Sequence, residues 1–329
     1  MNDGLLYEQK ESTTLHTWAK ANFLCCSVLF FCSCRWQAPG PEAWINHVWS
    51  ARADATGSTT MTDHPLPTYF ISHGGGPWPY VPEMRARMQV LEASLADIPL
   101  QIGTVPRAVL VVSGHWEAPE FTVMGNAKPP MVYDYSGFPE HTYHVLYPAP
   151  GAPDVAHRVQ QLASKAGIVV GMDMQQGFDH GTFAPLVVMY PQANVPVLQL
   201  SLKSGYDPQA HLAIGRALEP LRGEGVLIVG SGLSYHNLRN FGPQAALPSR
   251  QFDDWLQQTL VAASHQQRTA RLMDWQSAPA ARMAHPREDH LVPLMVALGA
   301  AEAEAAMVVY HETGVYGGVT ASSFRFGHA

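Results

Sequence analysis

Two kinds of hydrophobic pattern alternate along the chain. Uninterrupted apolar runs at residues 108–113 (AVLVVS) and 225–231 (GVLIVGS) are rich in β-branched side chains, which is typical of strands buried on both faces. Residues 83–96 instead place apolar side chains three or four positions apart. That spacing predicts a helix with one apolar face, made of Met84, Met88, Leu91 and Leu95.

The same patterns predict the remaining elements. Further strands are expected at residues 67–72, 168–172, 195–202, 306–310 and 321–326, and further helices at 152–167, 208–221, 249–263 and 291–298. Residues 183–190 are apolar and fit either a helix or a strand. Because strands alternate with helices, we predict an α/β fold: a single domain with a central, mostly parallel or mixed sheet flanked by helices on both faces.

The first 61 residues differ in character from the rest. The apolar run at residues 23–34 is shorter than the roughly 20 residues that a membrane-spanning helix needs. Acidic residues upstream of this run argue against a signal peptide. We therefore expect residues 1–61 to be an N-terminal extension, disordered or outside the fold, with a targeting segment as the alternative. The folded domain is then residues 62–329.

Composition narrows the function classes. Hydrophobic residues make up 47% of the chain and charged residues 14%, which indicates a globular protein. The net charge is -7 and no polybasic run occurs, so we expect no nucleic-acid partner. We also expect no membrane partner and a cytoplasmic location. The domain has no disulfide or thiolate metal site, because all four cysteines precede it, at Cys25, Cys26, Cys32 and Cys34.

The 16 histidines suggest a chemistry through their positions. His73, His115 and His236 each follow a predicted strand within a few residues, and ligand sites in α/β sheets form outside the carboxyl ends of strands. His180 and His290 lie in predicted loops just before apolar segments. Imidazole is a common ligand of zinc and iron. The histidines could therefore converge on one metal, or they could be unrelated loop residues that never meet.

Six short motifs, in order, resemble the class III extradiol ring-cleavage dioxygenases, specifically their DOPA-dioxygenase-like branch. The resemblance extends from about residue 67 to residue 326 and makes residues 62–329 an extradiol dioxygenase-like catalytic domain. The motifs are Ser72–Pro77 (SHGGGP), Ser113–Glu117 (SGHWE), Tyr147–Gly151 (YPAPG), Gly177–Phe183 (GFDHGTF), Ser231-Gly232 with His236–Leu238 (HNL), and Glu288–Leu294 (EDHLVPL).

The resemblance implies a role for each of the five histidines. In this family, histidines at the positions of His73, His115 and His290 bind one divalent metal per chain. Fe(II) is expected for activity, with Zn(II) as the metal that such proteins can also hold. His236 would be the catalytic acid/base, and His180 would stabilise bound intermediates. Two departures stand out: three glycines follow His73, and residues 233–235 differ from the usual pattern.

The expected reaction is the insertion of O2 into a catechol-type ring to give a ring-opened semialdehyde. The partners are then a small aromatic diol and O2, with the chain a monomer or small homo-oligomer. Trp116, Tyr135 and Phe138 are candidates for an apolar wall around the ring, although ordinary core packing explains them equally well. The sequence does not identify the particular catechol.

Two other functions fit the same histidines. A zinc hydrolase would use zinc-bound water, with Glu117 or His236 as its base. A non-catalytic metal-binding relative would keep only the scaffold. A carboxylate, Glu288 or Asp289, is the alternative third metal ligand because both residues adjoin His290.

Overall fold

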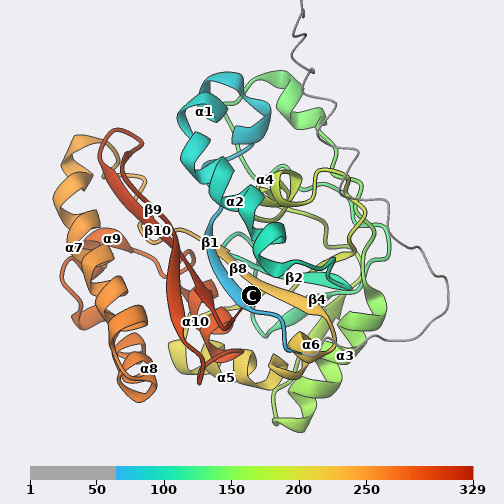
Figure 1. The fold of residues 1–329 in the computed structure, drawn as a ribbon. Helices are drawn as coiled ribbons and strands as arrows, with labels where there is room; N and C mark the ends of the chain where they lie inside the picture. The colour runs from blue at the N-terminus through green and yellow to red at the C-terminus, as the bar shows by residue number, and fades with distance from the viewer. Residues whose placement is uncertain (1–63, 329) are drawn as a thin grey trace, which may run out of the picture. The chain divides into compact units, whose positions relative to one another are not determined.

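A six-stranded mixed sheet forms the centre of the domain in this computed structural model, which describes residues 64–328 (Figure 1). The strand order is β6-β2-β8-β1-β10-β9. Strands β6, β2, β8 and β1 pair in parallel, and β10 pairs antiparallel with both β1 and β9. This arrangement confirms the predicted mixed sheet. The strands are β1 (Thr68–Ser72), β2 (Ala108–Ser113), β6 (Val197–Gln199), β8 (Val226–Gly232), β9 (Ala306–Val315) and β10 (Val319–Phe326).

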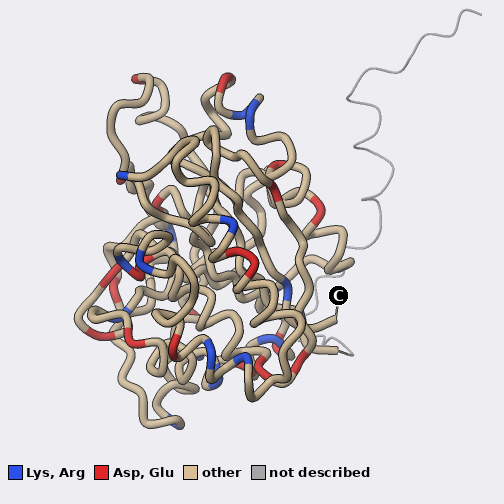
Figure 2. The backbone as a smooth tube through the Cα atoms, turned by 90° about the vertical axis from the view of Figure 1, so that its left-hand side faces the viewer, with Lys and Arg blue, Asp and Glu red and all other residues tan. Residues whose placement is uncertain are grey.

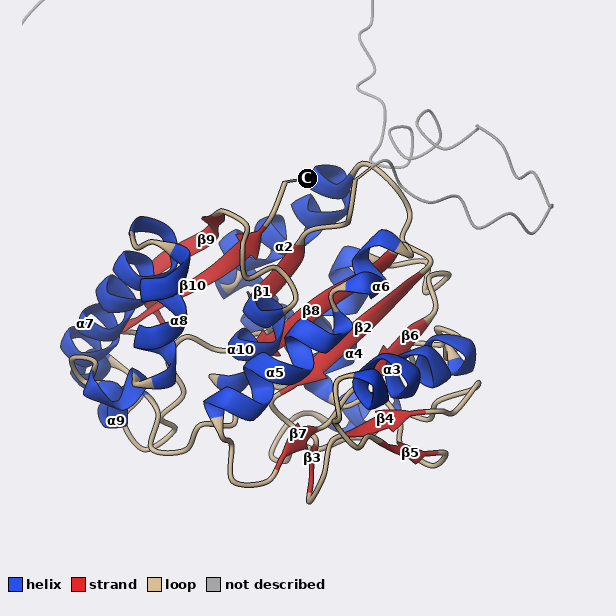
Figure 3. Ribbon diagram, turned by 90° about the horizontal axis from the view of Figure 1, so that it is seen from below, coloured by secondary structure: helices blue, strands red, loops and turns tan. Residues whose placement is uncertain are grey.

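Besides short 3-10 and π-helical segments, residues 64–328 contain two small parallel strand pairs and ten α-helices. The pairs are β3 (Glu117–Ala118) with β7 (Leu202–Lys203) and β4 (Thr122–Met124) with β5 (Gly171–Asp173). The helices are α1 (Pro82–Arg87), α2 (Gln89–Ile102), α3 (Pro153–Lys165), α4 (His180–Met189), α5 (Pro208–Leu218), α6 (Pro220–Gly223), α7 (Ala246–Gln257), α8 (His265–Met273), α9 (Ala281–Ala284) and α10 (Val292–Gly299) (Figure 3).

Helices cover both faces of the sheet, as predicted. Successive side chains of a strand point to opposite faces. On β1, the Thr68 hydroxyl donates to the Ala297 carbonyl of α10, whereas the neighbouring Tyr69 hydroxyl donates to Gln101 of α2. On β8, Ser231 likewise donates to the Gly181 carbonyl of α4. Helix α10 therefore lies on one face of the sheet, and α2 and α4 lie on the other.

Helix α10 is apolar on every side because it packs directly onto the sheet. All eight of its residues are buried. A helix with apolar residues all round belongs in the interior, whereas α3 shows an apolar stripe with polar residues opposite. The apolar sequence of α10 therefore buries this helix against the sheet, and the helix begins two residues after His290.

Three predicted elements are divided in the structure. The strand expected at 195–202 is interrupted after Gln199: the Leu200 amide still donates to Val111 of β2, but the Ser201 amide donates to the Thr122 carbonyl of β4, so the chain leaves the main sheet before β7. The helix expected at 208–221 ends at Leu218 because Pro220 has no N–H to continue it. The helix expected at 83–96 is likewise divided, at Met88.

Gly230→Ala should destabilise the domain by about 1–3 kcal/mol or more, the usual cost of overpacking. A Cβ at this position would lie 2.3 Å from the Pro293 carbonyl oxygen, which is backbone and has no rotamer to change. Urea unfolding measures the loss, with Gly223→Ala as the matched control because nothing lies within 4 Å of the added Cβ there. Equal stability of the two variants would contradict this packing.

The expectations about the N-terminal extension and about the cysteines concern residues that the structure does not describe. The extension at 1–61 and the four cysteines fall there, so the predicted domain boundary stays a prediction. Among residues 64–328, no helix is both long and apolar enough to cross a membrane. Basic and acidic residues are interspersed over the described backbone in Figure 2. The expected lack of a nucleic-acid partner also stays a prediction.

Candidate active site

Three imidazole nitrogens converge beyond the carboxyl ends of the sheet strands. The Nε2 atom of His115 lies 3.3 Å from Nε2 of His73 and 3.1 Å from Nε2 of His290. His73 directly follows β1, His115 follows β2 by two residues, and His290 lies two residues before α10. The parallel pairing of β1 and β2 with β8 brings these strand ends to one edge of the sheet.

Backbone contacts hold the loops that present the three histidines. The His73 amide donates to the Gly232 carbonyl over 3.1 Å, and the Leu233 amide donates to the His290 carbonyl over 3.2 Å. A Cβ on Gly232 would lie only 2.1 Å from that His290 carbonyl oxygen. The Ser231-Gly232 motif is thus explained by the close approach of the His290 backbone to the end of β8.

Two of the three glycines after His73, Gly74 and Gly76, are explained by aromatic rings that lie against them. Gly74 and Gly76 have positive φ angles of 81° and 53°, which side chains disfavour. A Cβ on Gly74 would meet the ring of Trp78 at 2.4 Å, and one on Gly76 would meet the ring of Phe138 at 2.6 Å. The departure from the family pattern therefore lets Phe138 approach the loop that positions His73.

Burial keeps the three converging histidines neutral. Desolvation lowers the pKa of His73 and of His115 well below the ordinary value, and it lowers the pKa of His290 to about 4. Nearby histidines lower the pKa of all three further, because a second positive charge would be repelled. At neutral pH each residue is an uncharged imidazole, which is the form that binds a metal.

The remaining two predicted histidines flank this group. The His180 ring lies over the His115 ring, with centroids 3.9 Å apart. The His236 ring stacks on the His290 ring, with centroids 3.4 Å apart and planes 19° apart. The structure therefore brings all five histidines of the sequence hypothesis together. The prediction that His180 lies in a loop is wrong. His180 is the first residue of α4, because Asp179 caps that helix.

Two carboxylates contact the outer nitrogens of these rings. Asp134 lies 3.2 Å from Nδ1 of His115 and 2.8 Å from Nδ1 of His180. Asp289 lies 3.1 Å from Nδ1 of His290 and 3.7 Å from Nδ1 of His236. Burial alone would raise the pKa of Asp289, but its contacts with His236 and His290 hold that pKa well below the usual range. Asp289 is therefore an ionised acceptor.

The donor set fits a metal ion. A carboxylate beside Nδ1 favours the proton on that atom, which leaves the Nε2 lone pair free. The Nε2 atoms of His115 and His290 lie 3.1 Å apart, where two lone pairs would repel unless a cation lies between them. Metal–nitrogen bonds of about 2.0–2.1 Å in tetrahedral geometry place ligand nitrogens about 3.3 Å apart, close to the separations seen here. The His73, His115 and His290 group could thus bind one metal.

Comparisons with known proteins agree with this geometry. A family model described as the catalytic LigB subunit of aromatic ring-opening dioxygenase matches residues 67–327. The chain belongs to this family. It is 36% identical to a 4,5-DOPA dioxygenase extradiol of Beta vulgaris over 79% of this chain and 96% of that protein. It is 32% identical to a protein of that name from Escherichia coli K12, over 81% and 97% of the two chains.

A solved structure supports the fold. A crystal structure of a protein from Escherichia coli K12, described as uncharacterized, matches with a TM-score of 0.66 and 28% identity. The match covers 80% of this chain and 100% of the other. Membership of a ring-opening dioxygenase family makes this chain an oxygenase-type enzyme with a metal-dependent site, an aromatic substrate and O2 as its expected co-substrate.

The carboxylates named as alternatives have other partners. Glu288 pairs with Arg282 over 2.7 Å. Asp289 meets the outer nitrogen of His290, on the other side of the ring from Nε2. Glu117 accepts hydrogen bonds from Tyr206 and from Ser204, and the hydrogen bond from Tyr206 is the main cause that lowers its pKa. A lowered pKa makes Glu117 a weaker base than the hydrolase alternative needs.

The three aromatic residues predicted to line the ring differ in what they contact. Trp116 and Tyr135 are partly buried and pack against the hydrophobic core, as the core-packing alternative expected. Tyr135 also lies beside His180, with ring centroids 5.9 Å apart, and beside Phe138, at 5.4 Å. Tyr135 and Phe138 thus form a continuous aromatic surface that reaches His180.

Sequence reasoning missed Asp134 and the capping role of Asp179. Asp134 sits in an irregular segment and shows no periodic signal. Asp179 could have been found, because an aspartate just before an apolar segment is a common N-terminal helix cap. Its carboxylate accepts hydrogen bonds from the Thr182 amide over 3.0 Å and from the Ser113 hydroxyl over 2.8 Å.

Asp179→Asn should change how stability depends on pH. Burial raises the pKa of Asp179 to about 7, above the value of about 3.9 for an unfolded chain. Between these values the folded state binds the extra proton, so this group's contribution to stability falls as pH rises from about 4 to 7. The free energy of unfolding of the variant should lack that component, which urea titrations at several pH values would show. Parallel pH profiles would contradict the assignment.

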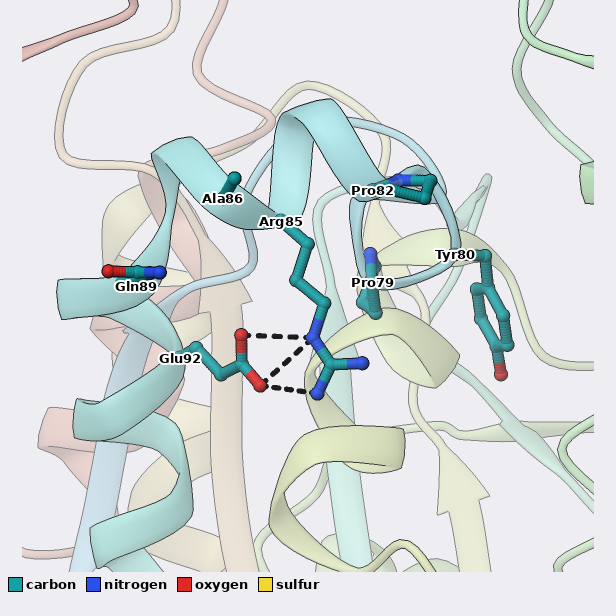
Figure 4. A pocket seen from close by; sticks show the side chains of 7 residues that line it. All are labelled: Pro79, Tyr80, Pro82, Arg85, Ala86, Gln89 and Glu92. Atoms are coloured by element: carbon teal, nitrogen blue, oxygen red, sulfur yellow. Dashed lines mark hydrogen bonds and ion pairs between the residues drawn. The ribbon is translucent and has the colours of Figure 1, made fainter.

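A separate depression lies beside α1 (Figure 4). Its lining includes Tyr80, Arg85 and Glu92, and none of the five histidines. Arg85 Nε lies 3.0 Å from both carboxylate oxygens of Glu92, so the charge in this depression is already paired. We assign it no function.

Proposed function

We propose that this protein is an Fe(II)-dependent extradiol dioxygenase that opens a catechol-type ring to a muconic-semialdehyde-type product. His73, His115 and His290 would be the metal ligands, with His236 and His180 as the catalytic histidines. The observation that supports this most is the convergence of three Nε2 atoms, flanked by two further imidazoles, in a member of a ring-opening dioxygenase family.

The three ligands supply neutral nitrogen donors from one side. That arrangement leaves coordination positions free for other molecules, as catalytic metal sites require. Fe(II), when bound, would supply the dioxygen chemistry that these side chains lack. Backbone hydrogen bonds hold the His73 and His290 loops against the end of β8, which would help to position the donors.

His236 would transfer protons. It lies against His290, and its side chain is 18% exposed, so a substrate hydroxyl can reach it. Imidazole accepts and returns protons near neutral pH. His236 would first remove a proton from a catechol hydroxyl and later return one to the ring-opened product. Its amide donates to the Ala284 carbonyl over 2.9 Å, which holds the loop that presents it.

His180 would hydrogen-bond to the oxygen atoms of the reacting molecules. Its side chain is only 8% exposed and its Nδ1 already contacts Asp134. Its Nε2 has no protein hydrogen-bond partner among residues 64–328 and is free for substrate. Tyr135 and Phe138 would form the apolar wall beside it, since flat aromatic side chains pack well against a flat ring.

The proposed substrate is a small aromatic diol. The names of two relatives refer to DOPA, which makes side-chain-bearing catechols the first compounds to test. The oligomeric state and the cytoplasmic location stay predictions.

Oxygen uptake tests the proposal. Protein loaded anaerobically with Fe(II) should consume oxygen when given one or more members of a catechol panel, with a new yellow chromophore. Protein that holds iron but consumes no oxygen with any catechol would contradict it. Hydrolytic activity that persists without oxygen would instead support the zinc hydrolase. The absence of both activities would support a non-catalytic metal-binding protein.

A further inference from the structure

A single carboxylate, Asp134, connects one of the proposed metal ligands to one of the proposed catalytic histidines. Its Oδ1 lies 2.8 Å from Nδ1 of His180 and accepts the His180 amide over 3.1 Å. Its Oδ2 lies 3.2 Å from Nδ1 of His115. One side chain thus makes three contacts with two of the five histidines, from a segment that belongs to no strand or helix.

The segment around Asp134 is fixed by its neighbours. The Tyr133 hydroxyl donates to the Val145 carbonyl over 2.8 Å, and the Tyr135 hydroxyl donates to the Thr142 carbonyl over 2.6 Å. Met131 pairs with Phe178, two residues before His180. These contacts remove the freedom of the loop, and a partner held in this way can orient a catalytic side chain accurately.

Hydrogen-bond chemistry then determines which nitrogen carries the proton. A carboxylate oxygen accepts, so His180 presents an N–H at Nδ1, where its 2.8 Å hydrogen bond to Asp134 lies, and the 3.2 Å approach of Asp134 Oδ2 to Nδ1 of His115 favours the same proton position on that ring. The Nε2 atom of a neutral ring then bears the lone pair. For His115 that tautomer is the one that can bind a metal through Nε2. For His180 it makes Nε2 an acceptor suited to a substrate hydroxyl, and Nε2 would donate to a bound oxygen atom only after taking up that hydroxyl proton.

We propose that Asp134 is a positioning residue that fixes the Nδ1–H tautomer of both His115 and His180 and so couples metal binding to substrate binding. This inference rests on the proposed function for its roles, but its geometry does not depend on which reaction the site performs. Partners of this kind typically change metal affinity or activity by about 10–100-fold when they are removed.

Asp289 provides an internal comparison. Its Oδ1 accepts the His290 amide over 2.8 Å and lies 3.1 Å from Nδ1 of His290, but among residues 64–328 that ring nitrogen has no hydrogen-bond partner, and Nδ1 of His236 is 3.7 Å away. Asp289 should therefore influence the ligand His290 through its charge and its backbone contact, and neither catalytic histidine through a hydrogen bond. Of the two carboxylates, only Asp134 contacts both a ligand and a catalytic histidine within hydrogen-bond distance.

A competing interpretation treats the carboxylates as ligands of further metals. The groups His115, Asp134, His180 and His236, Asp289, His290 each bring three potential ligand atoms within 4.8 Å of one another. Such sites would require His115 and His290 to bind a metal through each ring nitrogen at once. A ring that already gives Nε2 to one metal would have to lose its last proton, which makes the hydrogen-bonding role the simpler one.

Asp134→Asn tests the inference without disturbing the shape of the side chain. An amide has one acceptor oxygen and one donor nitrogen, so it cannot accept from both rings. One of the two histidines must then move its proton to Nε2. We expect Zn(II) affinity to fall about 10–100-fold in a chelator competition. In zinc-loaded protein with 15N-labelled histidine, the ring nitrogen shifts should show one changed tautomer.

Three variants make the test specific. Asp154→Asn is the control for charge removal, because the ion pair that Asp154 makes among residues 64–328 is with Arg107 at the surface, and it should change neither readout. Asp289→Asn should change the tautomer or metal affinity of His290 and leave His180 as it is. Asp134→Glu keeps an ionised acceptor and should keep both protons on Nδ1, which also guards against a folding defect in Asp134→Asn.

The outcomes separate this inference from the proposed reaction. Unchanged zinc affinity and unchanged tautomers in Asp134→Asn would overturn the inference, even if the wild type cleaves catechols. A wild type that binds more than one zinc per chain, with the extra ion lost in Asp134→Asn, would overturn it in favour of a second metal site. A tautomer change in a protein without dioxygenase activity would support the inference and contradict the proposed reaction.

Discussion

His290→Ala should bind Zn(II) or Fe(II) more than 100-fold more weakly than the wild type. The expected loss exceeds the 10–100-fold that follows removal of a ligand's hydrogen-bond partner, because the ligand itself is gone. His290 Nε2 lies 3.1 Å from His115 Nε2 in the three-histidine group. The substitution would leave only His73 and His115 as nitrogen donors. Competition against a chelator of known affinity measures the change.

A folding defect must be distinguished from loss of the ligand, because His290 is only 2% exposed. His290→Gln fills more of the space and should show the same weak binding with a native circular dichroism spectrum. His144→Ala removes an exposed histidine next to Glu140 and should bind metal like the wild type. Retention of wild-type affinity by both His290 variants would remove His290 from the ligand set.

His236→Ala should keep its metal and lose turnover. Removal of a general acid/base typically costs about 10²–10⁴-fold in rate. His236 stacks on the ring of His290 and is not itself one of the three proposed ligands, so metal affinity should change little. Steady-state kinetics of Fe(II)-loaded protein, with iron content measured on the same samples, test this prediction. Full activity in the variant would show that the acid/base is another group.

The strand ends were predictable because two independent signals coincide there. Residues 108–113 form a continuous β-branched run, and the structure has β2 over the same residues. A turn with glycine and then histidine follows that strand. The rule that sites form beyond the carboxyl ends of parallel strands predicts that His73, His115 and His236 meet, and the structure brings them together. Their chemical roles stay predictions.

The parts that sequence reasoning missed depend on contacts between distant irregular segments. Asp134 reaches His180 across 46 residues, and no periodicity links the two. The short pairs β3 with β7 and β4 with β5 comprise only two or three residues on each strand, too few to show an alternating pattern. The Cβ clash that requires Gly232 is with a backbone carbonyl of the His290 loop, which only the folded chain reveals.

Labelling with 18O2 tests the central claim most directly. Fe(II)-loaded protein is given its best catechol under 18O2, and the product is analysed by mass spectrometry, with the aldehyde trapped to prevent exchange with water. A dioxygenase places both atoms of one O2 molecule in the ring-opened product, so a mass increase of two 18O atoms is predicted. A ring-opened or cleaved product whose new oxygen comes only from water would contradict the account and assign the three-histidine site to hydrolysis.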